Sequence, residues 1–327
     1  MFLNYVNNIR GVAILFVILA HCFSCVPSQG WGILEKFSSN FAVPFVGVAG
    51  FLFAVLLPKY TYRAYMLGKF KYVVLPYIFM SVPAVAIYLT GSKTTHTWVD
   101  MDWFSTSLNP VQQYCYLMIT GAHLGPMWFV PMVILFYPLF PFFRWMKDRG
   151  FLGGVFVLAF CSALIVGRPW YNSNVLQAFV YYMPAYLAGI WLAENRWAYE
   201  NVRLDARLVI SLVISFMLLS YASLGGDSRI DLVMKLVLFW GLLCFFYHYV
   251  NKPIPFLSVC ASLSFYLVYA HGYLTGAIRM LYQKDVLSDG GIFLVGGAFV
   301  LVLAISIGSY YLLANVLGDK KRYFLGA

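Results

Sequence analysis

Long apolar segments alternate with short polar ones along almost the whole chain. Each apolar segment is about as long as the 20 residues that an α-helix needs to cross a hydrocarbon core of about 30 Å. Segment 293–316 is apolar apart from small and hydroxyl residues and Asn315, without the two-residue alternation of a barrel strand. The pattern predicts about ten transmembrane helices, at residues 9–26, 37–57, 72–90, 124–143, 151–167, 175–193, 208–224, 232–250, 256–277 and 291–316.

The basic residues between the predicted helices indicate their orientation. Fifteen of the 22 lysines and arginines fall on the side of the N-terminus. Cytoplasmic loops carry an excess of such residues, so we predict that both termini are cytoplasmic. Arg10 and the apolar segment after it imitate a signal peptide, but no small-residue cleavage site follows, so we expect the first helix to be retained. The prediction is an all-α, polytopic integral membrane protein with one domain, residues 1–327, and no separate soluble domain.

The composition agrees with a membrane environment. Hydrophobic residues make up 62% of the chain and charged residues 10%, a balance that would leave a water-soluble globule covered with apolar side chains. Cytoplasmic loops account for the net charge of +10, and without a basic helix or an RNA-binding signature we expect no nucleic-acid partner. His21, Cys22 and Cys25 lack the further ligands of a metal site, so we expect no metal.

His21 is the most informative ionisable residue, because ionisable groups at membrane depth are costly and often functional. It follows Arg10 by eleven residues, which places both within about 20° on one helix face and about 16.5 Å apart along the axis. Ile14, Val17 and Ile18 are expected between them on this face. The arrangement suits a channel for a long ligand with a charged head. The alternative is that His21 only hydrogen-bonds a neighbouring helix.

Several segments together resemble the acyltransferase-3 family of membrane acyltransferases. Residues 8–21, NIRGVAILFVILAH, are similar to the family's opening, which has Arg-Gly-x-Ala and then a His separated from the Arg by ten residues. Ala49 stands where the family's second helix usually has a serine. Four further segments resemble parts of the family in the family's order. Residues 44–52 are similar to its second helix and residues 69–77 to its basic loop and third helix. Residues 128–131 are similar to its Trp-Phe-Leu helix and residues 263–271 to its Ser-Phe, Tyr and His segment.

The resemblance spans nearly the whole chain and implies ten core helices and a transfer reaction. Family members move an acyl group, usually acetyl from cytoplasmic acetyl-CoA, to a hydroxyl of an envelope or exported polysaccharide or a lipid-linked sugar. His21 is then the candidate general base, since a neutral imidazole can take the proton of the hydroxyl. Arg10, Lys69 and Lys71 are candidates for binding the phosphates of CoA. Their alternative is positive-inside topology or contact with lipid headgroups.

Three further residues are candidates for binding the acceptor, namely Glu35, His123 and His271. Each has a structural alternative: a solvated loop charge for Glu35, a loop role for His123 and a hydrogen-bonded core histidine for His271. Three cations are interpreted as interface anchors or snorkelling side chains: Arg168, Lys235 and Arg279.

Other functions and partners stay open at this stage. We expect a multi-pass protein of a bacterial inner membrane that contacts membrane lipids and polysaccharide synthesis or export machinery. Succinyl or a longer acyl group could replace acetyl, and transfer could be direct or pass through an acyl-enzyme, although Ala49 offers no serine for one. The rival from another class is a transporter or flippase that exports a glycan or its lipid-linked precursor. A third alternative is a catalytically silent scaffold.

Overall fold

The computed structural model describes residues 3–25, 32–222, 224, 226–284, 286–287 and 291–327. These residues form helices and turns, and none of them forms a strand, which confirms the all-α prediction. Residue 26, the predicted end of the first transmembrane helix, and residue 223 of the seventh lie outside the described residues.

The helices follow one another with short connections. The first half comprises α1 (Asn4–Cys25), α2 (Gly32–Ser39), α3 (Ala42–Leu56), η1 (Leu57–Lys59), α4 (Tyr62–Lys69), η2 (Phe70–Val74), α5 (Leu75–Leu89), α6 (Met101–Ser107), α7 (Pro110–Thr120), η3 (Gly125–Trp128), α8 (Phe129–Ile134), α9 (Phe140–Asp148) and α10 (Leu152–Val166). The second half comprises η4 (Trp170–Asn172), α11 (Val175–Glu194), α12 (Trp197–Glu200), α13 (Ala206–Ala222), α14 (Ser228–Tyr249), α15 (Pro255–Ser262), α16 (Ser264–Gln283), α17 (Gly291–Leu317), η6 (Gly318–Lys320) and α18 (Lys321–Leu325).

The helices confirm a polytopic membrane protein. Within the described ranges, six helical segments are long and apolar enough to cross a membrane: Asn4–Cys25, Gly32–Lys59, Tyr62–Leu89, Val175–Glu194, Ser228–Tyr249 and Gly291–Leu325. Two bent helix pairs raise the number to eight if each is one crossing. They are Pro110–Thr120 with Gly125–Ile134, bent by 75°, and Pro255–Ser262 with Ser264–Gln283, bent by 77°. The sequence analysis expected ten, because it counted two apolar helices that are shorter than 18 residues, Leu152–Val166 and Arg207–Ala222.

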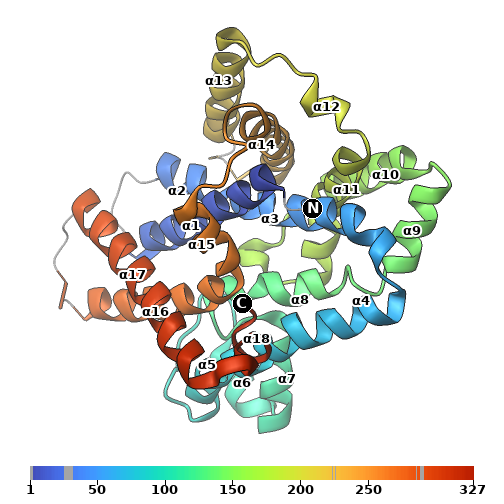
Figure 1. The fold of residues 1–327 in the computed structure, drawn as a ribbon. Helices are drawn as coiled ribbons and strands as arrows, with labels where there is room; N and C mark the ends of the chain where they lie inside the picture. The colour runs from blue at the N-terminus through green and yellow to red at the C-terminus, as the bar shows by residue number, and fades with distance from the viewer. Residues whose placement is uncertain (1–2, 26–31, 223, 225, 285, 288–290) are drawn as a thin grey trace.

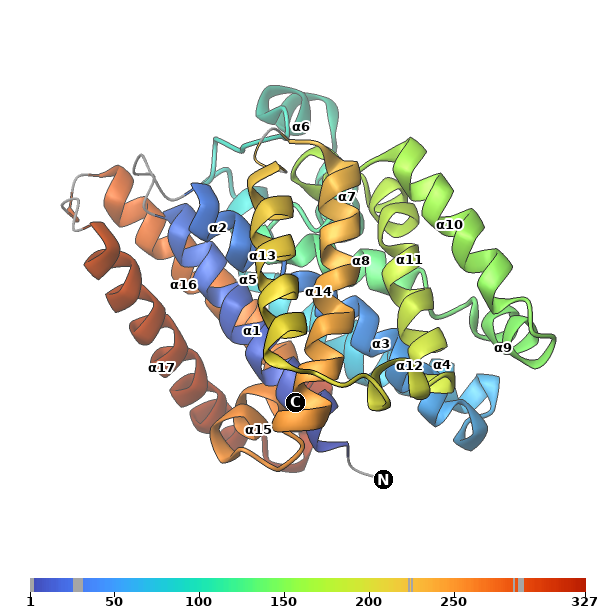
Figure 2. The same cartoon turned by 90° about the horizontal axis from the view of Figure 1, so that it is seen from above.

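The start of α1 and the C-terminus lie at the end of the helix bundle opposite to α6. Figure 2 shows the start of α1 and the C-terminus near α15 at the lower end, and α6 at the upper end. α17 and α10 lie on opposite flanks, and α1 and α14 lie between them (Figures 1 and 2). The described chain therefore begins and ends at the same end of the bundle.

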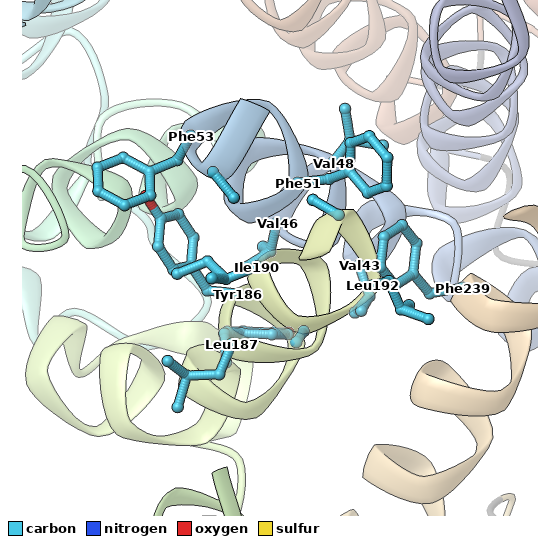
Figure 3. Close-up of a cluster of buried hydrophobic side chains, with 14 of the residues drawn as sticks. Val43, Val46, Val48, Phe51, Phe53, Tyr186, Leu187, Ile190, Leu192 and Phe239 are labelled. Atoms are coloured by element: carbon cyan, nitrogen blue, oxygen red, sulfur yellow. The ribbon is translucent and has the colours of Figure 1, made fainter. Parts of the chain in front are cut away.

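α3 and α11 cross closely because glycines line their contact. A Cβ atom on Gly50 would overlap the carbonyl group of Tyr186, and one on Gly189 would overlap the carbonyl oxygen of Gly47. Small residues let helix backbones approach in a membrane, where dispersion replaces the hydrophobic effect as the main attraction. Beside this crossing, Phe53 of α3 faces Tyr186 of α11 with their ring centroids 6.0 Å apart (Figure 3).

Two irregular segments have local causes. The π-helical segment η2 precedes Pro76, which has no N–H to bond the fourth residue before it, and the Leu75 N–H bonds Phe70 O across the widened turn. α7 ends at Gly121, whose φ of +71° favours glycine and whose Cβ would lie 2.5 Å from Trp128 N. The bend at Gly121 turns the chain so that Gly125 and Trp128 reach the site described below.

The α3–α11 crossing predicts opposite effects for two identical substitutions. Gly50→Ala should lower the stability of the purified protein by about 1–3 kcal/mol, because the methyl group forces the helices apart. Gly308→Ala in α17 is the control, since a Cβ there meets nothing within 4 Å and alanine favours a helix. The melting temperature in detergent measures both changes. If both variants melt at or above the wild-type temperature, this account of the crossing is wrong.

Candidate active site

One cavity brings the predicted donor-binding and catalytic residues together. It has a volume of about 740 Å³, within the range of small-molecule sites. Arg10 and His21 both line it, which confirms that they share a face of α1. Val17 lies between them on the cavity wall. Ile14 and Ile18, expected on the same face, are instead fully buried in a cluster with residues of α15 to α18, because each lies further round the helix.

Arg10 joins α1 to the break between α15 and α16. Its Nη2 donates to the carbonyl oxygen of Ala261 and to the Oγ of Ser264, both at 3.0 Å. Ala261 lies in the last turn of α15, where carbonyl groups lack partners within the helix. The next residue, Gly11, allows the approach, since a Cβ on it would lie 2.5 Å from the carbonyl oxygen of Leu257. Arg10 thus caps a helix end while it lines the cavity.

Lys69, a second cation of the cavity, lies near two aromatic rings. The Nζ of Lys69 lies 5.2 Å from the ring centroid of Tyr65 and 4.9 Å from that of Tyr137, distances typical of cation–π contacts. Lys71 and Arg322 also line the cavity, and its described wall contains no aspartate or glutamate. Four cations without a carboxylate make this wall suitable for a ligand with several negative charges.

The opposite part of the cavity contains His21 beside a second histidine. The ring centroids of His21 and His271 are 5.1 Å apart, although His271 is fully buried and does not line the cavity. The Nδ1 of His271 donates to the carbonyl oxygen of Leu267, so its Nε2 carries a lone pair when the ring is neutral. This Nε2 has no hydrogen-bond partner in the described structure. Gly125 also adjoins His21, since a Cβ on it would lie 3.8 Å from the His21 Cε1.

The remaining histidines have structural hydrogen bonds. His96, His123 and His248 each pair a ring nitrogen with a backbone carbonyl oxygen at 3.0 Å, those of Ala122, Leu117 and Tyr199 respectively. The other nitrogen of His123 lies 2.8 Å from the Oγ of Ser81. Burial also lowers the pKa of His96, which favours its neutral ring. Of the five histidines, all within the described ranges, only His21 lines the cavity.

The structure does not bring every candidate residue to the cavity. Glu35 lies in the first turn of α2 and does not line the cavity, and neither does His123. Ala49, at the position where a serine was considered, does line it, as does Trp128, which stacks on Tyr182 with ring centroids 5.5 Å apart.

The interpretation of Lys235 as an interface anchor is wrong, because it lies in a buried ionic cluster, to which the partly exposed Arg168 also belongs. Asp231 is the common partner: Lys36 Nζ lies 3.0 Å from its Oδ1, Arg168 Nη1 lies 3.6 Å from its Oδ2, and Lys235 pairs with Oδ2. The hydroxyl of Tyr181 also donates to Oδ2, at 3.2 Å. Such a cluster is stable only while its carboxylate is present.

Sequence reasoning missed Arg322 and the tyrosines of the cavity. Arg322 was only one of the 15 basic residues that indicated the orientation, yet it lines the cavity from a helix more than 300 residues after Arg10. Tyr65 precedes Lys69 by four residues, so helical spacing could have paired them. No local signal pointed to Tyr137.

Comparison with known proteins gives one further finding. A family model of the acyltransferase-3 family, described as an acyltransferase domain, matches residues 3–313. No curated protein and no solved structure matches the chain. The matched range includes every cavity residue named above except Arg322.

Proposed function

This chain belongs to the acyltransferase-3 family, and we propose that it moves an acetyl or similarly small acyl group from acyl-CoA to a hydroxyl of an envelope or exported polysaccharide or a lipid-linked sugar. The observation that carries this proposal is the composition of the cavity. It joins Arg10, Lys69 and Lys71 to one histidine without a carboxylate in its described wall. Such a site can bind a polyanionic thioester donor with its cations and provide a general base with its histidine.

The cavity suits the shape of acyl-CoA. The phosphates would lie near Arg10, Lys69 and Lys71. Apolar residues such as Leu52 and Val133 also line the cavity and would contact the pantetheine arm. Arg10 and His21 are about 16.5 Å apart along α1, so an extended arm can bring its thioester to His21 while the nucleotide stays near the cations.

His21 would act on the acceptor hydroxyl. Its neutral imidazole takes the hydroxyl proton as the oxygen attacks the thioester carbonyl carbon. The tetrahedral intermediate then collapses, the carbon–sulfur bond breaks, and the CoA thiolate takes the proton from the imidazolium. Direct transfer is favoured because Ala49 has no nucleophile and the Ser264 hydroxyl already accepts a hydrogen bond from Arg10. No cysteine lies in the described cavity wall.

Orientation and location belong to the same proposal. We propose ten crossings, which adds the two shorter apolar helices to the six continuous segments and the two bent pairs. An even number agrees with the termini at one end of the bundle (Figure 2), which we place in the cytoplasm of a bacterium with the protein in its inner membrane. The acceptor would then approach from the far side, with Glu35, His123 and His271 still the candidates nearest to it. Membrane lipids and polysaccharide synthesis or export machinery are the proposed partners.

A transporter or flippase is the second candidate, because the cations of the cavity could also bind a phosphate-bearing glycolipid. The family match favours the acyltransferase. The two functions differ in a simple measurement, since a transferase consumes acyl-CoA and a transporter moves its cargo unchanged.

Replacement of His21 tests the proposed base. The purified wild-type protein should release CoA from radiolabelled acetyl-CoA and transfer the label to extracted envelope glycan. His21→Ala should lower this rate by about 10²–10⁴-fold, because general-base catalysis contributes that much. His248→Ala, which loses a hydrogen bond to Tyr199 and a ring contact with Tyr247 outside the cavity wall, is the control and should keep most of the activity. A folded His21→Ala variant with the wild-type rate would refute the assignment, and a wild type that consumes neither acetyl-CoA nor a longer acyl-CoA would favour the transporter.

His271 is proposed as a positioning residue: its Nε2 lone pair, which has no partner in the described structure, would accept a hydrogen bond from the His21 ring once the donor is bound. His271→Leu should lower kcat by about tenfold, the equivalent of one lost hydrogen bond, and leave the KM for acyl-CoA within about twofold. His271→Gln retains an acceptor and should recover part of kcat. Steady-state kinetics at the same degree of folding measures both variants. Equal kcat values for the leucine and glutamine variants would show that no such hydrogen bond operates.

A further inference from the structure

The short helix α18 is held firmly beside the cavity. Leu325 is 2% exposed, and the ring of Phe324 lies 4.5 Å from that of Phe79, centroid to centroid. Gly326 has a φ of +74°, and a Cβ there would overlap the ring of Phe265. Since Phe265 lines the cavity, α18 packs directly on the cavity wall, next to α5 (Figure 1). Buried contacts on both sides of the helix therefore fix its position.

These contacts place Arg322 at the cavity. Its guanidinium carbon lies 4.0 Å from the ring centroid of Tyr72, and the ring of Tyr72 stacks on that of Tyr323 at 5.6 Å. Tyr72 and Arg322 both line the cavity. A guanidinium stacked on a ring loses little further freedom when it binds a ligand, and its edge keeps its N–H donors available.

The charge of Arg322 has no partner of opposite sign in the described structure. No ion pair connects it to a carboxylate, and Asp319, the acid nearest in sequence, is exposed and forms no ion pair either. Arg322 shares the cavity with Lys71, Lys69 and Arg10, all of the same sign. Like charges around one cavity favour a bound anion, and the planar guanidinium fork matches the oxygens of a phosphate.

We propose that α18 completes the donor site and that Arg322 binds a phosphate of the nucleotide end of acyl-CoA. This inference rests on the proposed function. It adds a part of the chain that the family match, residues 3–313, does not include. Phosphates of lipid headgroups share the same chemistry, so the experiment must separate the two sources.

The experiment compares two donors that differ only in the nucleotide. Acetyl-CoA carries the phosphates, and S-acetyl-pantetheine carries the thioester without them. For the full-length Arg322→Ala variant, the KM for acetyl-CoA should rise about tenfold, while the KM for S-acetyl-pantetheine and both kcat values stay within about twofold. Arg322→Lys should lie between, because lysine offers a point charge instead of a fork. Lys320→Ala, which removes an equal charge two residues away and outside the cavity wall, is the control and should change neither KM.

Each other outcome decides against the inference. If the KM rises equally for both donors, Arg322 only supports the fold of α18. If neither KM changes and only the dependence of the melting temperature on anionic lipid is reduced, Arg322 binds headgroups. The proposed function is tested separately by the wild type: if it turns over acetyl-CoA, that function stands even when Arg322→Ala has no effect. A wild type that turns over neither donor would overturn both.

Discussion

A guanidinium among membrane helices needs hydrogen-bond acceptors, and Arg10 finds them where α15 ends and α16 begins. Several features of the site depend on this contact. It brings α1 against α15, which Gly11 permits, and it fixes the rotation of α1 that carries His21 to the same cavity about three turns further on. The break that supplies the acceptors also starts α16, whose first residues line the cavity and whose His271 reaches His21.

The protein pairs one group of cations with a carboxylate and leaves a second group, in which Lys71 and Arg322 are exposed, without one. Lys36, Arg168 and Lys235 converge on Asp231, so a carboxylate offsets part of their charge. The cations of the cavity share no such partner in the described structure. An unpaired charge in a low-dielectric region is costly unless water solvates it or a ligand of opposite charge binds it. This contrast supports a binding role for the cavity cations and a structural role for the Asp231 cluster.

Local patterns in the sequence predicted the features that depend on residues close together in the chain. Apolar segment length gave the helices, and helical spacing placed Arg10 and His21 on one face. The ion pair of Lys36 with Asp231, the contact of His21 with His271 and the place of Arg322 join residues that are far apart in the chain, so no periodicity could reveal them. The prediction that Ile14 and Ile18 face the cavity was wrong, because the part of α1 that lines the cavity is narrower than the helix face that was expected to line it. Hydropathy also missed the bend near Leu263, inside the predicted helix 256–277, since apolar residues continue on both sides of that break.

The central claim is that acyl-CoA occupies this cavity with its thioester at His21. Cryo-electron microscopy of the protein in nanodiscs with a thioether analogue of acetyl-CoA, which cannot react, tests it most directly. The account predicts phosphate density within hydrogen-bond distance of Arg10, Lys69 or Lys71 and the sulfur atom in contact with the His21 ring. Density for the analogue outside the cavity, or with its acyl end away from His21, would contradict the account.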